Sequence, residues 1–364
     1  MKIGIIDADL ITRKRHRFPN LTSMKLSAYH KKLGDDVKLL LSYTQIKEYD
    51  KVYISKVFTD TEVPPGVCEL PFVEYGGTGF FYDKAEPLPE EIEHTMPDYS
   101  LYDDFVKSLL ANGAKHNEIK YYTDFSIGFT TRGCIRGCKF CVNQNYTQAK
   151  RHSYVREWLD PERKYICCLD DNVLACKDWK EIFSELNATG KKFQFKQGLD
   201  ERILTAEKCE ILFNSKWIGE YIFAFDNIQD RETIIKKLDM IRQHTSRVIK
   251  FYCFCGFNHE APGEYNAEFW SQDIKDLFER IKILFSFRAL PYIMRYKDYE
   301  LSPYRGMYIT IARWCNQPNF CKKMSFRQFA EVNGGASLRY AEQFERENPD
   351  IAKMYYDMKW GDNE

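Results

Sequence analysis

The sequence lacks an excess of charge of either sign. Lys plus Arg and Asp plus Glu each number 53, so the formal net charge is +0. No overall field attracts a polyanion from a distance, and a nucleic-acid partner would have to be held by a local basic patch. The one basic cluster, Arg13, Lys14, Arg15, His16 and Arg17, is most simply a solvated loop, with binding of an anionic substrate or phosphate as the alternative.

Long hydrophobic runs are also missing. No stretch approaches the roughly 18 to 20 apolar residues of a membrane span. The first apolar run is interrupted by Asp7 and Asp9, unlike the core of a signal peptide. We therefore expect a cytoplasmic protein with no membrane partner, in which the 12 cysteines are thiols or metal ligands and not disulfides.

Short apolar runs alternate with amphipathic stretches over the second half of the chain. Helical patterns cover 179–187, 206–213, 232–243 and 274–285. Nearly continuous apolar runs, which we expect to be strands, cover 125–130, 165–169, 192–196, 221–225, 248–254 and 289–294. Parallel strands that helices cover on both faces have this apolar character, so the order predicts an α/β fold with six strand-helix units in an open, partial barrel.

The two ends of the chain differ from this pattern. Apolar runs at 2–6, 37–41 and 52–54, with a helical pattern between the first two, predict a small Rossmann-like α/β layer. The stretch 64–98 is rich in Pro and Gly and is typical of a connection. The predicted domains are therefore a Rossmann-like layer at 1–85, a linker at 86–124, the partial barrel at 125–300 and a helical C-terminal cap at 301–364.

One motif carries clear chemistry. In TRGCIRGCKFC, Cys134, Cys138 and Cys141 follow the first barrel strand, at the strand end where barrel folds place their active sites. Iron–sulfur clusters usually take four cysteine thiolates, so three would leave one iron with an open position. The alternatives are a zinc site completed by a distant residue or three buried thiols, but the second CxxC pair usual for zinc is absent.

This spacing resembles that of the radical S-adenosylmethionine (SAM) superfamily, and the strand-helix order from 125 to 299 is similar to the superfamily's partial barrel. The resemblance implies that the three cysteines hold a [4Fe-4S] cluster and that SAM binds its open iron. It further implies reductive cleavage of SAM to a 5′-deoxyadenosyl radical, which abstracts hydrogen from a substrate that the sequence does not identify. An electron donor such as flavodoxin or ferredoxin would supply the electron.

The resemblance also implies which residues contact SAM. Phe140 matches the aromatic residue that contacts adenine. Polar residues after the second, third and fourth barrel strands would bind the amino group, the carboxylate and the ribose of SAM, and they are Asp170, Asp171, Asn172, Gln197, Asp200, Arg202, Asp226 and Asn227. Asp and Asn are also favoured as helix caps, so a purely structural role is an equal alternative for them.

The beginning of the chain, together with PDYS at 97–100, is similar to the cobalamin-binding domain that often precedes such a barrel. The DxHxxG signature that supplies a histidine to cobalt is absent, which argues against cobalamin. His16 lacks the neighbours of that signature, and His30, on a predicted helix, is expected at the surface. We therefore expect a layer with a binding or scaffolding role.

Several alternatives stay open at this point. Most of the other cysteines are expected to pack in the core, although Cys253, Cys255, Cys315 and Cys321 could ligate an auxiliary cluster. The alternative to a radical enzyme is a non-catalytic iron–sulfur protein with a structural or redox-sensing role. Within the enzymes, a cobalamin-dependent methylase and a tRNA-modifying enzyme are both compatible with the motif.

Overall fold

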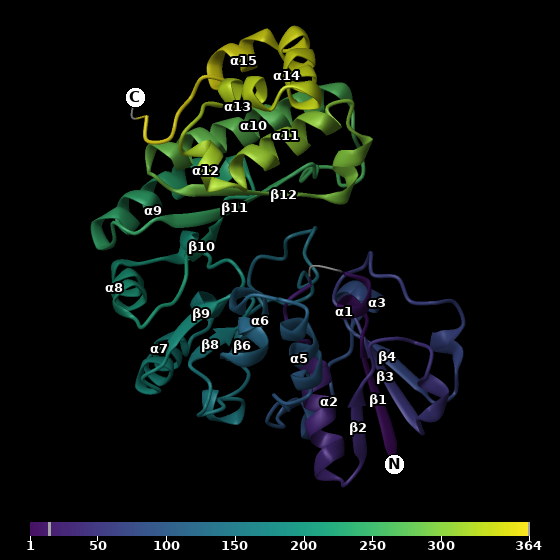
Figure 1. The fold of residues 1–364 in the computed structure, drawn as a ribbon. Coiled ribbons are helices and arrows are strands. Elements are labelled where there is room, and N and C mark those ends of the chain that lie inside the picture. Colours follow the sequence, from purple (N-terminus) through teal and green to yellow (C-terminus); the bar gives the residue numbers. More distant parts are fainter. Residues whose placement is uncertain (14–15, 363–364) are drawn as a thin grey trace. The chain divides into compact units, whose positions relative to one another are not determined.

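The computed structural model describes residues 1–13 and 16–362 (Figure 1). Lys14 and Arg15 of the basic cluster lie outside the described residues. No helix in the described part is long and apolar enough to cross a membrane. The chain divides into two compact units, of which the first is Met1–Asp171 with Cys176–Phe195 and the second is Asn172–Ala175 with Lys196–Glu364.

A four-stranded parallel sheet begins the first unit, in the order β2-β1-β3-β4. Its strands are β1 (Lys2–Asp7), β2 (Asp36–Leu39), β3 (Lys51–Ser55) and β4 (Val73–Gly76). Side chains alternate along β1, so that Ile3 and Ile5 enter the core on one face of the sheet and Ile6 enters the core on the other. This sheet is the α/β layer that the sequence predicts, with β4 as an added strand in the stretch expected to be a connection.

Helices cover this sheet and lead to the next one. They are α1 (Ala8–Thr12), α2 (Leu21–Lys32), α3 (Thr78–Phe81), α4 (Glu90–Glu93), α5 (Asp103–Ala111) and α6 (His116–Thr123). Residues of α2, α4, α5 and α6 share one core with β1. The PDYS stretch is anchored at both sides, because Asp98 accepts a hydrogen bond from Ser27 Oγ (2.6 Å) and Tyr99 Oη accepts one from the amide of Ile127 (2.9 Å).

The rest of the first unit is a three-stranded parallel sheet in the order β5-β8-β9. It consists of β5 (Phe125–Gly128), β8 (Tyr165–Cys168) and β9 (Lys192–Phe195), with the helix α7 (Trp179–Ala188). Phe183 of α7 packs against Phe193 and Phe195 of β9. After β5 the chain forms a separate antiparallel pair, β6 (Thr131–Arg132) with β7 (Lys150–Arg151).

The second unit contains another three-stranded parallel sheet, in the order β10-β11-β12. Its strands are β10 (Tyr221–Ala224), β11 (Ile249–Cys255) and β12 (Leu290–Arg295), and its helices are α8 (Ala206–Asn214), α9 (Arg231–His244) and α10 (Ala267–Ser286). The chain continues through α11 (Arg305–Cys315), α12 (Pro318–Cys321), α13 (Phe326–Asn333), α14 (Gly335–Glu347) and α15 (Pro349–Tyr355). The segment after residue 300 is therefore helical, as expected.

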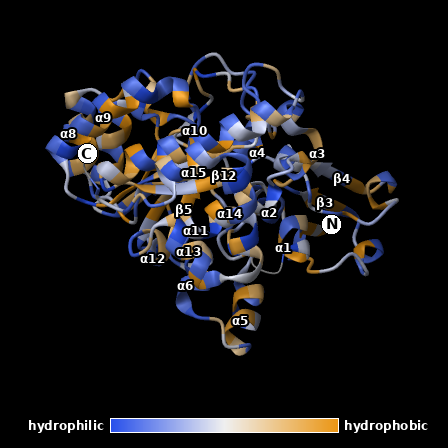
Figure 2. Ribbon diagram, turned by 90° about the horizontal axis from the view of Figure 1, so that it is seen from above, coloured by the Kyte–Doolittle hydropathy of each residue, from blue (hydrophilic) through white to orange (hydrophobic). Residues whose placement is uncertain are grey.

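Single-turn 3₁₀ helices connect many of these elements. They are η1 (Ile46–Glu48), η2 (Val67–Glu69), η3 (Tyr82–Lys84), η4 (Val155–Glu157), η5 (Val173–Ala175), η6 (Glu201–Ile203), η7 (Ile228–Asp230) and η8 (Lys297–Leu301). Hydrophobic and hydrophilic residues alternate around the longer helices (Figure 2), as expected where one face packs on a sheet.

All six strands expected between 125 and 294 are present, with ends shifted by no more than two residues. The structure is therefore a mixed α/β fold with parallel sheets and helices. The six strands are hydrogen-bonded as two three-stranded sheets, one in each unit, and not as one continuous sheet. A single partial barrel stays a prediction.

Candidate cofactor site

Cys134, Cys138 and Cys141 lie on one loop, residues 133–149, which we call the cysteine loop. The antiparallel pairing of β6 with β7 closes this loop at its base. All three cysteines are half-buried, and the amide of Cys141 donates a hydrogen bond to the carbonyl of Cys138 (2.9 Å). The three thiols of the motif therefore share a loop that is tied at both ends and partly open to solvent.

Glycine is required at the start of the cysteine loop. Gly133 has φ +92°, and a Cβ there would lie 2.4 Å from the backbone oxygen of Gln148. Gly137 also has a left-handed backbone, with φ +58°, but a Cβ there would meet no atom closer than 3.8 Å. The first glycine thus permits both a turn and a close approach of two backbone segments, whereas the second permits only a turn.

Asp170, which follows β8, holds the chain just before the cysteine loop. Its carboxylate is 2% exposed and accepts hydrogen bonds from the amide of Thr130 (3.1 Å) and from the hydroxyl of Thr131 (2.7 Å). The hydroxyl of Thr130 and the amide of Thr131 bind the same carboxylate. Burial raises the pKa of Asp170, and these hydrogen bonds oppose the rise. Its contacts are internal to the protein, and a contact with SAM stays a prediction.

Asp171 binds the cysteine loop itself. One carboxylate oxygen accepts from the amide of Gly133 (2.8 Å) and the other from Asn143 Nδ2 (2.7 Å). These two positions flank the three cysteines, so a single side chain fixes both sides of the motif. Phe140, between Cys138 and Cys141, is half-buried.

The remaining predicted cofactor residues belong to the second unit, where three of them form a network. Asn172 Nδ2 donates to Asp200 (3.2 Å), and Arg202 Nε donates to the other oxygen of Asp200 (2.9 Å). Arg202 Nη1 also binds Asp230 (2.8 Å). The guanidinium expected to bind a ligand carboxylate is thus paired with two carboxylates of the protein. Gln197 is exposed.

Asp226 and Asn227 follow β10 and have local partners. Asp226 accepts a hydrogen bond from the amide of Phe254 (3.0 Å), and burial raises the pKa of its carboxyl. Asn227 Oδ1 accepts from the amide of Gln229 (3.0 Å) and caps η7. The cap is the structural role that the sequence offers as an alternative for Asn227.

Glu201 is a buried acid that the sequence analysis did not single out. Its side chain has 0% exposure, accepts a hydrogen bond from the amide of Ala224 at the end of β10 (3.1 Å), and lies 4.0 Å from Arg202 Nε. Burial raises its pKa to about 8, which favours the protonated form of the carboxyl. The burial of Glu201 cannot be predicted from a local sequence pattern, because it results from tertiary packing.

The cysteines outside the motif are in the core. All of them except Cys68 are buried, and burial raises the pKa of Cys209 to about 11, of Cys253 to about 12 and of Cys321 to about 11. Their burial agrees with the core packing that the sequence predicts for them, and an auxiliary cluster stays an untested alternative. Among the described residues, no group of three or more His, Cys, Asp or Glu is placed to hold a single metal ion. A four-iron cluster is larger and needs its thiolates further apart.

The histidines of the N-terminal layer do not fit a histidine-ligated cobalamin. His30 is buried, because α2 turns this face towards β3, and the expectation of a surface histidine is wrong. Its Nδ1 contacts Asp35 (2.7 Å) and its Nε2 contacts Tyr53 (3.0 Å), so protein groups occupy both ring nitrogens. His16 packs edge-on against Phe58, and burial lowers its pKa.

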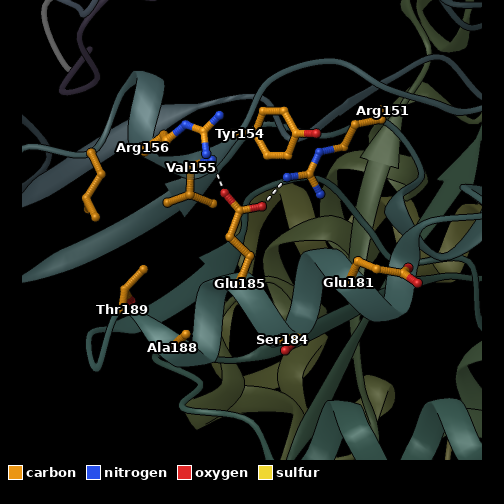
Figure 3. A pocket seen from close by; sticks show the side chains of 10 residues that line it. Arg151, Tyr154, Val155, Arg156, Glu181, Ser184, Glu185, Ala188 and Thr189 are labelled. Atoms are coloured by element: carbon orange, nitrogen blue, oxygen red, sulfur yellow. Dashed lines mark hydrogen bonds and ion pairs between the residues drawn. The ribbon is translucent and has the colours of Figure 1, made fainter.

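A surface hollow of about 630 Å³ lies beside η4 and α7 (Figure 3). Arg151 and the amide of Val155 both bind Glu185, and the ring of Tyr154 is flanked by the guanidiniums of Arg151 and Arg156, each 4.6 Å from its centroid. The lining residues include none of the predicted cofactor residues. This hollow is therefore separate from the cysteine loop.

Similarity to known proteins is found for the structure and not for the sequence. No protein-family model matches the sequence, and no curated protein matches it. Among solved structures, the chain is similar to cobalamin-dependent radical SAM enzymes. The TsrM methyltransferase from Kitasatospora setae, with cobalamin and a [4Fe-4S] cluster bound, gives a TM-score of 0.49 at 11% identity, over 81% of this chain and 74% of that one.

A second structure of the same enzyme, with tryptophan and a SAM analogue bound, gives a TM-score of 0.49 at 11% identity, over 80% of this chain and 72% of that one. The enzyme OxsB, with aqua-cobalamin and SAM bound, gives a TM-score of 0.47 at 12% identity. That alignment covers 99% of this chain but only 64% of OxsB.

Proposed function

We propose that this chain is a radical SAM enzyme in which Cys134, Cys138 and Cys141 hold a [4Fe-4S] cluster. The observation that carries the proposal is the contrast among the cysteines. The three in the CxxxCxxC motif are half-buried on one anchored loop, whereas all the others except Cys68 are buried. Three thiol donors on a loop beyond β5 fit a cluster that keeps one iron open for a ligand.

The cofactors would supply the chemistry, and the chain would hold them. A [4Fe-4S] cluster held by Cys134, Cys138 and Cys141 would supply the electron for reductive cleavage of bound SAM into methionine and a 5′-deoxyadenosyl group that would abstract hydrogen from the substrate. Asp171 orients the cysteine loop by binding it on both sides of the motif. Asp170 fixes the two threonines that precede the loop. A loop held in this way keeps its three sulfurs in place without reorganisation during electron transfer.

SAM would be bound by residues at the strand ends. We also propose that the six strands form one partial barrel. Phe140, Gln197 and Asn172 would contact the cofactor directly, together with Asp226. Arg202 is held between Asp200 and Asp230. We therefore assign to Arg202 the positioning of Asp200, in place of direct binding of the SAM carboxylate.

No step in this proposal uses cobalamin, because the N-terminal histidines do not fit it as ligands. An electron donor such as flavodoxin or ferredoxin would reduce the cluster. The competing function is a non-catalytic iron–sulfur protein with a structural or sensing role. The two differ in one property, since only the enzyme cleaves SAM.

The test is anaerobic incubation of the reconstituted protein with dithionite and SAM, followed by chromatography for 5′-deoxyadenosine and methionine. We expect both products even without substrate, since the radical is quenched slowly in an empty site. The Cys68→Ala variant is the matched control and should behave as the wild type. A protein that keeps its cluster but cleaves no SAM above a no-enzyme reaction would favour the sensing function.

A further inference from the structure

Two residues of the N-terminal layer reach the cysteine loop. Tyr82 Oη donates a hydrogen bond to the carbonyl of Phe140 (2.7 Å), between the second and third cysteines of the motif. The carboxylate of Asp83 accepts from Gln144 Nε2 (3.0 Å) and Asn145 Nδ2 (3.1 Å), just after the third cysteine. Asn145 Nδ2 also donates to the carbonyl of Asp83 (3.2 Å), so four hydrogen bonds that involve side chains link η3 to the part of the loop that Asp171 does not bind.

The backbone at this contact is held in an uncommon conformation. Tyr82 has φ +49° and ψ −114°, a strained backbone conformation that bulky residues rarely adopt. Such a conformation persists only where surrounding contacts over-determine it. The hydrogen bond of its hydroxyl to the cysteine loop is one of these contacts.

The segment before Tyr82 is fixed to the first sheet. A Cβ on Gly77 would lie 2.4 Å from the backbone oxygen of Lys56, and one on Gly79 would lie 2.7 Å from that of Phe58. The amide of Gly79 donates to the carbonyl of Lys56 (3.0 Å). These glycines let α3 lie directly against the chain that leaves β3, so η3 follows a segment that is packed beside the sheet.

We propose that Tyr82 and Asp83 form a latch through which the N-terminal layer positions the cysteine loop. The layer then acts as a scaffold for the cluster ligands. This inference rests on the proposed function for the role of the loop, but the latch itself does not depend on a bound cluster. Both are positioning residues, because they act on the backbone and amide groups around the cysteines.

The experiment compares wild-type protein with the variants Tyr82→Phe, Asp83→Ala and the loop-side double variant Gln144→Ala/Asn145→Ala. Hydrogen–deuterium exchange of peptides covering residues 133–149 and trypsin cleavage after Lys139 are measured in the cluster-free protein. Each lost hydrogen bond should raise the rates of exchange and cleavage roughly two- to tenfold. Tyr75→Phe, which alters a tyrosine of β4 packed on Phe80 and Phe81, is the matched control and should change neither rate.

The reconstituted protein gives two further measurements. The same three variants should release iron to a chelator faster than wild type, and the electron paramagnetic resonance spectrum of the reduced cluster should change, because it reports the geometry around the irons. If the variants fold normally by circular dichroism and their loop exchange equals that of Tyr75→Phe, the latch is refuted. If Tyr82→Phe does not fold, the double variant on the loop decides in the same way.

The outcomes also separate the latch from the proposed function. Loop protection that depends on Tyr82 and Asp83 in a protein that never takes up iron would support the latch and overturn the function. A protein that cleaves SAM with unchanged loop protection in all three variants would support the function and overturn the latch.

Discussion

The carboxyl ends of β1 and β5 each lie beside a buried aspartate, but the chain that follows differs between them. Both strands belong to parallel sheets of the first unit, and a buried aspartate lies at each end. Asp7 accepts hydrogen bonds from the amide of Leu10 (3.2 Å) and from Tyr102 Oη (2.9 Å), while Asp170 accepts from Thr130 and Thr131. In both places the protein's own groups satisfy the carboxylate.

The chain that follows is what differs. Asp7 is the N-cap of α1, so a helix begins directly where β1 ends and closes that edge. Beyond β5 the chain leaves the sheet through the β6–β7 pair and carries three half-buried cysteines. Similar contacts at the strand ends thus support a closed edge in one sheet and an open, cysteine-bearing loop in the other, and in the proposed function the connecting segment carries the chemistry.

The largest expected effect concerns this difference directly. Replacing Cys134, Cys138 and Cys141 by alanine should abolish the cluster, because no iron keeps a protein ligand from the motif. Iron content and visible absorbance after anaerobic reconstitution measure it. Cys68→Ala, which changes the half-buried cysteine of the N-terminal layer, should retain a full complement of iron. Full iron in the triple variant would mean that the cluster site lies elsewhere.

At the closed edge, the buried carboxyl of Asp7 should make the stability of the protein depend on pH. Burial raises the pKa of Asp7 from 3.8 to about 7, so between these values the folded state holds a proton that the unfolded state has released. Stability should fall as pH rises from about 4 to about 7, by up to about 4 kcal/mol. Asp7→Asn should remove this fall. Denaturant unfolding at several pH values tests it, and parallel curves for the two proteins would contradict a protonated Asp7.

At the open edge, Asp170→Ala should lower the free energy of unfolding by about 3 kcal/mol, because it leaves the amide and hydroxyl donors of Thr130 and Thr131 without an acceptor in the core. Asp171→Ala removes two hydrogen bonds at a less buried site and should lower it by only about 1 kcal/mol. Urea unfolding measures both. Equal losses of unfolding free energy would mean that the deeper burial of Asp170 does not make its hydrogen bonds more important for stability than those of Asp171.

The two glycines of the cysteine loop should differ from each other, and Gly137 should give one of the smallest effects. Gly137→Ala strains only the backbone and should cost about 1 kcal/mol. Gly133→Ala adds a clash with the backbone of Gln148 and should cost clearly more, with lower iron retention. Thermal unfolding shows which of the two variants is less stable. The reverse order would show that the loop backbone is not held as described.

Much of this comparison could be predicted from the sequence, since apolar runs mark the strands and the cysteine spacing marks the loop. Strand β4 was missed, because only Val73 of VEYG is buried and the strand follows a Pro- and Gly-rich stretch. The burial of His30 and Glu201 and the contact of Tyr82 with Phe140 were also missed. Each depends on segments far apart in the chain, and no local period or spacing encodes such contacts.

The distribution of cysteines also determines how the protein should respond to air. Oxidation to sulfenic acid and beyond follows thiolate character and exposure. Buried thiols such as Cys168, Cys255 and Cys315, whose pKa burial raises, are protected on both counts, whereas the three cysteines of the motif are partly accessible. Damage on aerobic handling should therefore concentrate at the motif while the core stays intact. A folded, monodisperse preparation can in this way have lost its iron ligands, so that purity and shape are poor guides to whether it is competent.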